Sequence, residues 1–341
     1  MFESYNKDKI NRQEQDLPPL PLNAEQTQEL IKLFEEEEAQ QEHLILLENE
    51  VSPGVDEAAY VKAGYLKELA LEQSHSNLIS PSHAIKLLGT MLGGYSVEAL
   101  VSILKSSNYQ KEAAEALKHT ILVYDAFNEV YDMSSENEFA QDVINSWAEA
   151  EWFTKKPDLA KEIELKIFKV SGETNTDDFS PAKEAWSRPD IPLHAQAFLK
   201  FSENIADPLA ELNSFKQDGS NLVFVGDVVG TGSSRKSAVN SMLWHMGDDI
   251  PNVPAKKTGG FCLGNKIAPI FYNTLQDSGA LPIELDVENL NHGQKIILKP
   301  YDGEIMDKES GEVVSKFNLK SEVLLDEVKA LTPYQSNMAL Q

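Results

Sequence analysis

A glycine-rich segment between a predicted strand and a predicted helix constrains this chain more than any other feature. The apolar run Asn221–Val225 has the composition of a buried strand, and Ser237–Met246 has helical spacing. Between them, Gly230–Lys236 places two hydroxyls and a guanidinium on glycine-flexed backbone. Glycines let backbone amides approach an anion, and the following helix turns its positive end toward it. The segment therefore predicts an α/β domain with an anion-binding loop.

Two nucleotide-binding motifs resemble this loop in glycine content but differ from it at Arg235. A phosphate-binding P-loop needs a Gly-Lys-Ser/Thr sequence, and here the residue before Lys236 is Arg235. A dinucleotide-binding fingerprint needs a third glycine at that same place. Both motifs are therefore excluded. A strand-to-helix turn that uses glycine only for its shape stays open, since short glycine patterns are weak signals.

The chain divides near residue 155 into a helical part and a part that mixes strands and helices. In the first part, apolar faces at helical spacing are separated by signals such as Asp56 and Ser80-Pro81. Short loops favour stacked antiparallel helix pairs, although no clean repeat is visible. In the second part the predicted strands are Leu165–Val170, Asn221–Val225, Leu281–Leu285, Lys295–Lys299, Val313–Val314 and Phe317–Leu319, and the predicted helices include Ile267–Leu275. We expect a multidomain α plus α/β protein with domains at 1–155 and 156–330 and a tail at 331–341.

Charge and cysteine content narrow the classes of partner. The 341 residues carry a formal net charge of −25, which repels a phosphate backbone and weighs against nucleic-acid binding. The candidates for a local basic patch are Arg235, Lys236, Lys256 and Lys257. No apolar run reaches the roughly 18 residues of a membrane span, and no signal peptide is visible. One cysteine excludes an internal disulfide and suggests a reducing, cytoplasmic setting.

The acidic run Glu35–Glu38 invites a metal-binding interpretation that its geometry does not support. Four consecutive helical positions point all around the helix axis, so their carboxylates do not converge on one ion. We interpret the run as a solvated helix end.

Several long strings of this sequence point to a known family. They are Pro53–Gly64, Leu88–Met91, Trp186–Ala195, Val225–Ala238, Met246–Pro251 and Lys266–Phe271. In these strings the chain, from about Pro19 to about Val328, resembles the N-terminal portion of bacterial aconitase B, an aconitate hydratase. The resemblance implies an all-α, HEAT-like helical solenoid over 1–155, an aconitase-type α/β swivel domain over 156–330, and a divergent tail over 331–341.

The resemblance also implies the roles of residues in the glycine loop. In the family's Ser-Ser-Arg sequence the first serine is the catalytic base, and the second serine and the arginine bind substrate. These roles fall on Ser233, Ser234 and Arg235, and Arg188 matches a second arginine for a substrate carboxylate. The chemistry agrees, because a guanidinium forms a fork for a carboxylate, and amides with a nearby cation stabilise a serine alkoxide.

The family's cofactor sets a limit on this chain. Asp177 and Asp178 lie in a segment that helps to order the family's site, so the resemblance gives them a supporting role. The family's chemistry uses a [4Fe-4S] cluster held by three cysteines, and Cys262, in an apolar glycine-rich stretch, is not one of them. We therefore expect no metal or cofactor in this chain unless a partner or further domains supply the cluster.

Three hypotheses about function remain open. The favoured one is an aconitase-B-related protein that is inactive alone and uses its helical domain for protein contacts. The second is a split subunit that completes an aconitate hydratase site in trans, for which the small subunit of isopropylmalate isomerase sets a precedent. The third is a fragment of a full-length enzyme. As partners we expect a second copy through the helical domain, or an aconitase-type catalytic chain, and a weakly bound tricarboxylate; we expect no membrane.

Overall fold

The described residues form two compact units. The computed structural model describes residues 3–331 except 92, 107, 121–123, 234 and 322. Within this range, the helical unit holds everything up to Lys156 together with Pro251–Pro254, and the α/β unit holds the remainder. The fold class is therefore α plus α/β, as predicted. Among the described residues, no helix combines the length and the apolar character needed to cross a bilayer.

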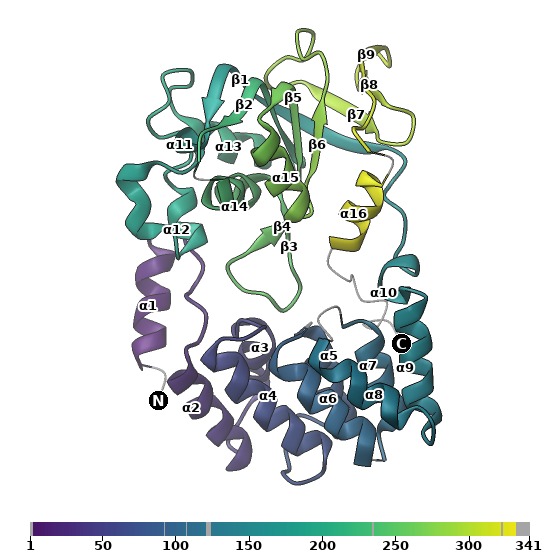
Figure 1. Cartoon of the computed structure of the whole chain (residues 1–341). Helices are drawn as coiled ribbons and strands as arrows, with labels where there is room; N and C mark the ends of the chain where they lie inside the picture. Colours follow the sequence, from purple (N-terminus) through teal and green to yellow (C-terminus); the bar gives the residue numbers. More distant parts are fainter. Residues whose placement is uncertain are drawn as a thin grey trace. The chain divides into compact units, whose positions relative to one another are not determined.

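The helical unit is built from helices joined by short loops (Figure 1). Their bounds are α1 Glu3–Gln13, α2 Ala24–Glu35, α3 Gln41–Asn49, α4 Glu57–Ala70, α5 Pro81–Thr90, α6 Tyr95–Ser106, α7 Gln110–Lys118, α8 Tyr124–Met133, α9 Glu138–Ala148 and α10 Glu151–Thr154. Sequential helices pack in pairs, α4 on α5, α6 on α7 and α8 on α9, and α4 also packs on α6 and α5 on α7. Stacked helix pairs are the arrangement that short loops predict.

The helix boundaries follow the capping signals of the sequence. The Asp56 side chain accepts a hydrogen bond from the Ala59 amide at 2.8 Å, and the Ser80 hydroxyl accepts one from the His83 amide at 3.2 Å. Each side chain satisfies an amide that the first helical turn leaves without a partner. The acidic run Glu35–Glu38 lies exposed at the end of α2, which confirms that it is a solvated helix end.

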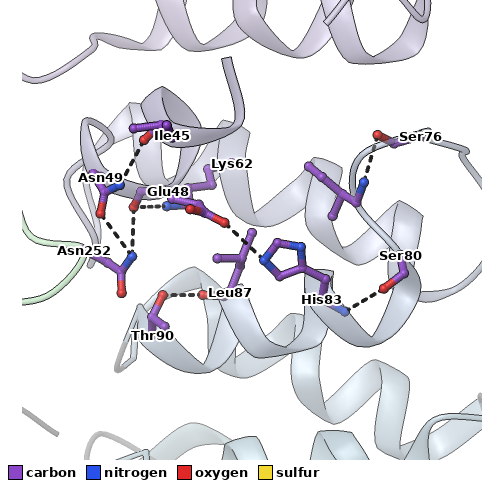
Figure 2. A network of polar contacts seen from close by, with 11 residues as sticks. Ile45, Glu48, Asn49, Lys62, Ser76, Ser80, His83, Leu87, Thr90 and Asn252 are labelled. Carbon is purple, nitrogen blue, oxygen red and sulfur yellow. Dashed lines mark hydrogen bonds and ion pairs between the residues drawn. The ribbon is translucent and has the colours of Figure 1, made fainter. Parts of the chain in front are cut away.

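A polar network joins α3, α4 and α5 to the Pro251–Pro254 segment of the same unit (Figure 2). Lys62 of α4 is 1% exposed, and its Nζ donates to the Glu48 carbonyl at 3.3 Å. The amide Nδ2 of Asn252 donates to the same carbonyl and to Asn49 Oδ1, each at 3.4 Å. The Glu48 carboxylate lies 3.1 Å from Nε2 of His83. Burial desolvates the ammonium and lowers the pKa of Lys62 to about 8.

The α/β unit is organised around a mixed sheet (Figure 1). Its described strands are β1 Ile163–Asn175, β2 Leu222–Thr231, β5 Phe261–Ile267, β6 Leu281–Glu284, β7 Lys295–Lys299, β8 Glu304–Asp307 and β9 Val313–Lys316, in the order β6-β5-β2-β1-β7-β8-β9. The strands β6, β5, β2 and β1 pair in parallel, and β7, β8 and β9 extend the sheet in antiparallel pairs. The short strands β3 Asp248–Asp249 and β4 Lys257–Thr258 pair separately.

Helices connect and cover these strands. They are α11 Thr176–Phe179, the 3-10 helix η1 Ala182–Ser187, α12 Ile191–Ala195, α13 Pro208–Lys216, α14 Arg235–Met246, α15 Pro269–Asp277 and α16 Leu324–Leu331. The predicted strand–loop–helix at 221–246 is confirmed as β2 followed by α14. The predicted strand at Phe317–Leu319 is wrong, because β9 ends at Lys316. The helix predicted at Ile267–Leu275 begins only at Pro269, since Ile267 still belongs to β5.

A cluster of buried aromatic rings lies beneath the start of α11 and the glycine loop. Phe179 stacks on Phe198 and on Phe271, with ring centroids 5.3 and 5.6 Å apart, and meets Phe224 edge-on at 5.0 Å. All four rings are fully buried. Such pairs contribute beyond their buried area, so they fix the segments that carry them. Because Phe179 ends α11 and Phe224 belongs to β2, the cluster locks these two segments together.

Candidate functional site

The candidate site lies where the parallel strands β1 and β2 end side by side. Their register runs to the pair Asn175 and Thr231, and the Thr231 hydroxyl donates to Glu173 Oε1 at 2.6 Å. In open α/β sheets, ligands bind beyond the carboxyl ends of parallel strands. The structure therefore brings together the two segments that the sequence singled out, the one after β1 and the loop Gly230–Lys236 after β2.

Two glycines of the loop allow this close approach. Gly230 has φ +80°, and a Cβ there would lie 2.2 Å from ring carbons of Phe271. Gly232 has φ +107°, and a Cβ there would lie 2.5 Å from the Thr176 hydroxyl. Both positions combine left-handed backbone with space for a hydrogen atom only. The loop consequently packs directly on the start of α11 and on α15.

The side chains of the loop lie at the N-terminus of α14. Ser233 is exposed, and Arg235, the first residue of α14, is half-buried. The Arg235 amide donates to the Ser233 carbonyl at 2.9 Å, which fixes the turn between them. Ser234, predicted to bind substrate, lies outside the described residues. A hydroxyl and a guanidinium beside the positive end of a helix form a suitable environment for a carboxylate.

Arg188 follows η1 and is oriented by Ser180. Its Nε donates to the Ser180 hydroxyl and its Nη2 to the Ser180 carbonyl, each at 3.2 Å. The Ser180 hydroxyl also lies 2.7 Å from the hydroxyl of Ser237, in the first turn of α14. A single serine thus links Arg188 to the helix that begins at Arg235. Of the two arginines that the resemblance assigns to substrate, Arg188 is thus hydrogen-bonded through Ser180 to the helix whose first residue is Arg235.

A histidine that the sequence analysis did not single out completes this chain. His194 of α12 is 1% exposed, with Nε2 2.7 Å from the Ser180 hydroxyl and Nδ1 2.8 Å from the Ser187 hydroxyl. Burial, and secondarily the charge of Arg188, lower the pKa of His194. The only signal in the sequence was the position of His194 within the string Trp186–Ala195. No spacing rule connects it to Ser180.

A second histidine holds α12 to α14. Nε2 of His245 lies 2.8 Å from the carbonyl of Ala195, which can only accept, so this nitrogen carries the proton. Burial lowers the pKa of His245 to about 4, and Lys216 and Lys257 add to the shift against the opposing effect of the hydrogen bond. His245 is therefore neutral near pH 7.

Asp177 and Asp178 belong to the turn that begins α11. The Asn175 side chain accepts hydrogen bonds from their amides at 2.7 and 3.1 Å, and Asp178 Oδ2 accepts one from the Asn175 amide at 2.8 Å. These reciprocal bonds form a capping box. Burial raises the pKa of the Asp178 carboxyl. The geometry gives Asp178 the task of shaping the turn that faces the glycine loop.

The residues of this chain do not fit an iron–sulfur cluster. Cys262, its one cysteine, is fully buried in β5, and burial raises the pKa of its thiol, which disfavours the thiolate that iron binds. A cubane cluster needs about three such thiolates. Over the described residues, no group of three or more His, Cys, Asp and Glu side chains is arranged to hold a metal ion.

In this chain a helical domain is followed by an α/β domain that carries a serine- and arginine-bearing loop at the end of a parallel strand. Two family models match this chain. "Aconitate B N-terminal domain" matches residues 4–153, and "Aconitate hydratase 2 N-terminus" matches residues 165–335. The chain belongs to the aconitate hydratase B family, of which it corresponds to the N-terminal part.

Curated relatives show the same extent of similarity. Aconitate hydratase B of Salmonella typhimurium is 51% identical over 341 residues, and that of Escherichia coli is 50% identical over 341 residues. Each match covers 97% of this chain and 39% of the relative. Aconitate hydratase B of Synechocystis is 52% identical over 334 residues, covering 97% of this chain and 38% of the relative. The chain thus spans about two fifths of the length of the relatives it matches.

Proposed function

We propose that this chain supplies the base and part of the carboxylate-binding surface of an aconitate hydratase site. The observation that carries the proposal is the hydrogen-bonded link from Arg188 through Ser180 to Ser237, which sets one arginine beside the helix that starts at Arg235. Ser233 at the exposed tip of the loop would accept the proton from a tricarboxylate. Ser234, Arg235 and Arg188 would bind carboxylates of that substrate.

We propose further that the chain is inactive alone. Removal or addition of a hydroxyl in this family depends on iron as a Lewis acid, and the residues of this chain do not fit the cluster that carries it. The cluster would be supplied by a partner or by further domains. The second candidate function, completion of the site in trans, rests on the exposure of Ser233 at the strand ends, where a separate catalytic chain could reach it.

Partners and setting follow from the same reasoning. The helical unit would contact proteins, either a second copy of this chain or an aconitase-type catalytic chain, as stacked helix pairs present extended surfaces for binding. A half-site with two arginines should bind a tricarboxylate only weakly, at roughly millimolar concentration. We place the chain in the cytoplasm, because its one cysteine is buried and a reducing setting suits an iron–sulfur partner.

Joining the chain to the rest of a relative tests the proposal. The portion of Escherichia coli aconitate hydratase B that follows the matched region would be produced fused to this chain, and also as a separate polypeptide. We expect conversion of citrate by the fusion, none by the chain alone, and a loss of at least about a hundredfold in the fusion with Ser233→Ala, since a general base contributes about that much. Matched controls are the fusion with Ser214→Ala, an exposed position in α13 of the α/β unit, and the separately produced remainder.

The outcomes separate the proposals. Activity of the chain alone would contradict its inactivity, and an active Ser233→Ala fusion would contradict the base assignment. Activity from a mixture of the two separate polypeptides would establish completion in trans, and its absence beside an active fusion would reject that second candidate.

A further inference from the structure

A directed chain of hydrogen bonds runs from η1 through His194 to Ser180 and α14. Its members are the Glu184 carbonyl, Ser187, His194, Ser180 and Ser237, and Arg188 joins it at Ser180. Ser180 and His194 are almost fully buried, and Ser187 is 4% exposed. Polar groups buried in this way are costly unless each is satisfied, so the arrangement of their few protons is constrained.

The proton positions in this hydrogen-bond chain can be assigned by starting at the Glu184 carbonyl. The Ser187 hydroxyl donates to the Glu184 carbonyl at 2.8 Å, because a carbonyl can only accept. Having one proton, Ser187 must then accept from Nδ1 of His194. A neutral imidazole protonated at Nδ1 has a bare Nε2, which accepts from the Ser180 hydroxyl at 2.7 Å. Because the Ser180 proton points to Nε2 of His194, the Ser180 oxygen can accept a hydrogen bond from Nε of Arg188.

We propose that His194 is a positioning residue of the site: by accepting the Ser180 proton it makes Ser180 the acceptor that orients Arg188 and ties it to the first turn of α14. The inference deepens the proposed function, on which it rests for the role of Arg188 in carboxylate binding. His194 itself is buried and is linked to Arg188 by hydrogen bonds through Ser180, so it is not assigned a catalytic role. Without it, Ser180 would donate its proton to the Ser237 hydroxyl 2.7 Å away, and its oxygen would no longer be held in the orientation that accepts from Nε of Arg188.

Ser237 connects this hydrogen-bond chain to the glycine loop. Ser237 follows the loop Gly230–Lys236 by one residue, and its hydroxyl lies 2.7 Å from that of Ser180. The hydroxyl of Ser180 therefore contacts both Arg188, which follows η1, and α14, which follows the glycine loop. His194 fixes the two carboxylate-binding segments relative to each other through this one atom.

The first test needs no ligand. Labelling the full chain with ¹⁵N-histidine and ¹⁵N-arginine reports the imidazole tautomer and the Nε–H of Arg188. We expect His194 to be neutral with the proton on Nδ1, and we expect the Arg188 Nε–H signal to shift in His194→Asn. His194→Gln should restore it, because its amide oxygen reaches the place of Nε2 whereas that of asparagine does not. A His194 proton on Nε2, or an Arg188 signal unchanged in His194→Asn, would overturn the proposal.

The second test measures citrate binding by the same full-length variants. Loss of a hydrogen bond to a charged group predicts a dissociation constant about tenfold higher in His194→Asn and Ser180→Ala, with His194→Gln within about twofold of the wild type. Ser237→Ala should weaken binding, whereas Ser241→Ala should not. Ser241 is the matched control, being a buried serine of α14 whose hydroxyl has no hydrogen-bond partner among the described residues. Equal weakening by asparagine and glutamine would overturn the proposal.

The two tests distinguish the failure of this inference from that of the proposed function. If wild-type chain shows no citrate response, the proposed function fails, while the tautomer and the Arg188 signal still decide whether His194 orients that side chain. If citrate binds but the His194 variants leave both readouts unchanged, the proposed function stands and the positioning role is rejected.

Discussion

Replacing Lys62 by methionine should stabilise the helical unit near pH 7. Lys62 is almost fully buried, and its pKa is lowered from 10.5 to about 8. Each pKa unit corresponds to about 1.4 kcal/mol, so keeping this ammonium charged in the folded state costs about 3 kcal/mol. Methionine has a similar length and no charge. It forgoes the bond of the charged ammonium to the Glu48 carbonyl, worth about 1.5 kcal/mol at this long separation, which leaves a net gain of roughly 1.5 kcal/mol.

The pH dependence identifies the cause. Between about pH 8 and 10.5 the unfolded lysine is protonated and the folded one is not, so the unfolded state binds more protons and the stability of the wild type rises with pH. The advantage of Lys62→Met should shrink by about 1.4 kcal/mol per pH unit across that window. Urea unfolding of the full chain, followed by far-ultraviolet circular dichroism at several pH values, measures this difference.

A control variant isolates the effect of burial. Lys67→Met removes a partly exposed lysine from the same helix, α4, and should change stability by less than about 0.5 kcal/mol at every pH. A Lys62→Met variant that is destabilised near neutral pH, or one whose advantage does not vary with pH, would show that the buried charge of Lys62 does not cost stability.

Two further variants probe the α/β unit. For His245→Gln, which keeps a donor for the Ala195 carbonyl but does not titrate, we expect calorimetry to find less acid destabilisation than in the wild type. The folded pKa of His245 is about 4, so the stability that its neutral form contributes is complete above about pH 6.5 and has fallen by about 2 kcal/mol at pH 5. Parallel acid profiles of the two proteins would rule this out. Gly230→Ala should destabilise the unit by about 2–4 kcal/mol in urea unfolding, because it combines left-handed backbone strain with a clash against Phe271. The control Gly219→Ala, at φ +75° with open space around it, should lower the stability by only about 1 kcal/mol. Equal losses of stability would show that the contact with Phe271 does not matter.

Features that local sequence patterns mark were predicted, whereas some features that depend on tertiary pairing were missed. Asp56 and Ser80 cap the helices that follow them, since a cap depends on residues only three apart. The glycine loop after β2 was identified because its positive-φ positions demand glycine. By contrast, β5 was missed: Gly264, Asn265 and Lys266 break its apolar pattern, and the strand exists because β2 and β6 pair with it on both sides.

The residues of the candidate site also fall into two groups, those that sequence motifs identify and those that tertiary packing brings together. Ser233, Arg235 and Arg188 belong to sequence motifs of the family, so the resemblance can assign their roles residue by residue. The bonds that orient Arg188 come from Ser180 and His194, which are brought together by the packing of α11 and α12 on α14. No periodicity or spacing links these residues, so their role could be found only from coordinates.

Citrate binding at the glycine loop can be tested by titrating the full chain with citrate and following backbone amide shifts, with sulfate as a control for general anion binding. We expect Gly230–Lys236 and the residues around Arg188 to respond to citrate at roughly millimolar concentration. Sulfate, which lacks the spaced carboxylates, should cause smaller shifts at the same ionic strength. Shifts confined to another region, with the glycine loop unaffected by citrate, would contradict the assignment of Ser233, Arg235 and Arg188 to a tricarboxylate site.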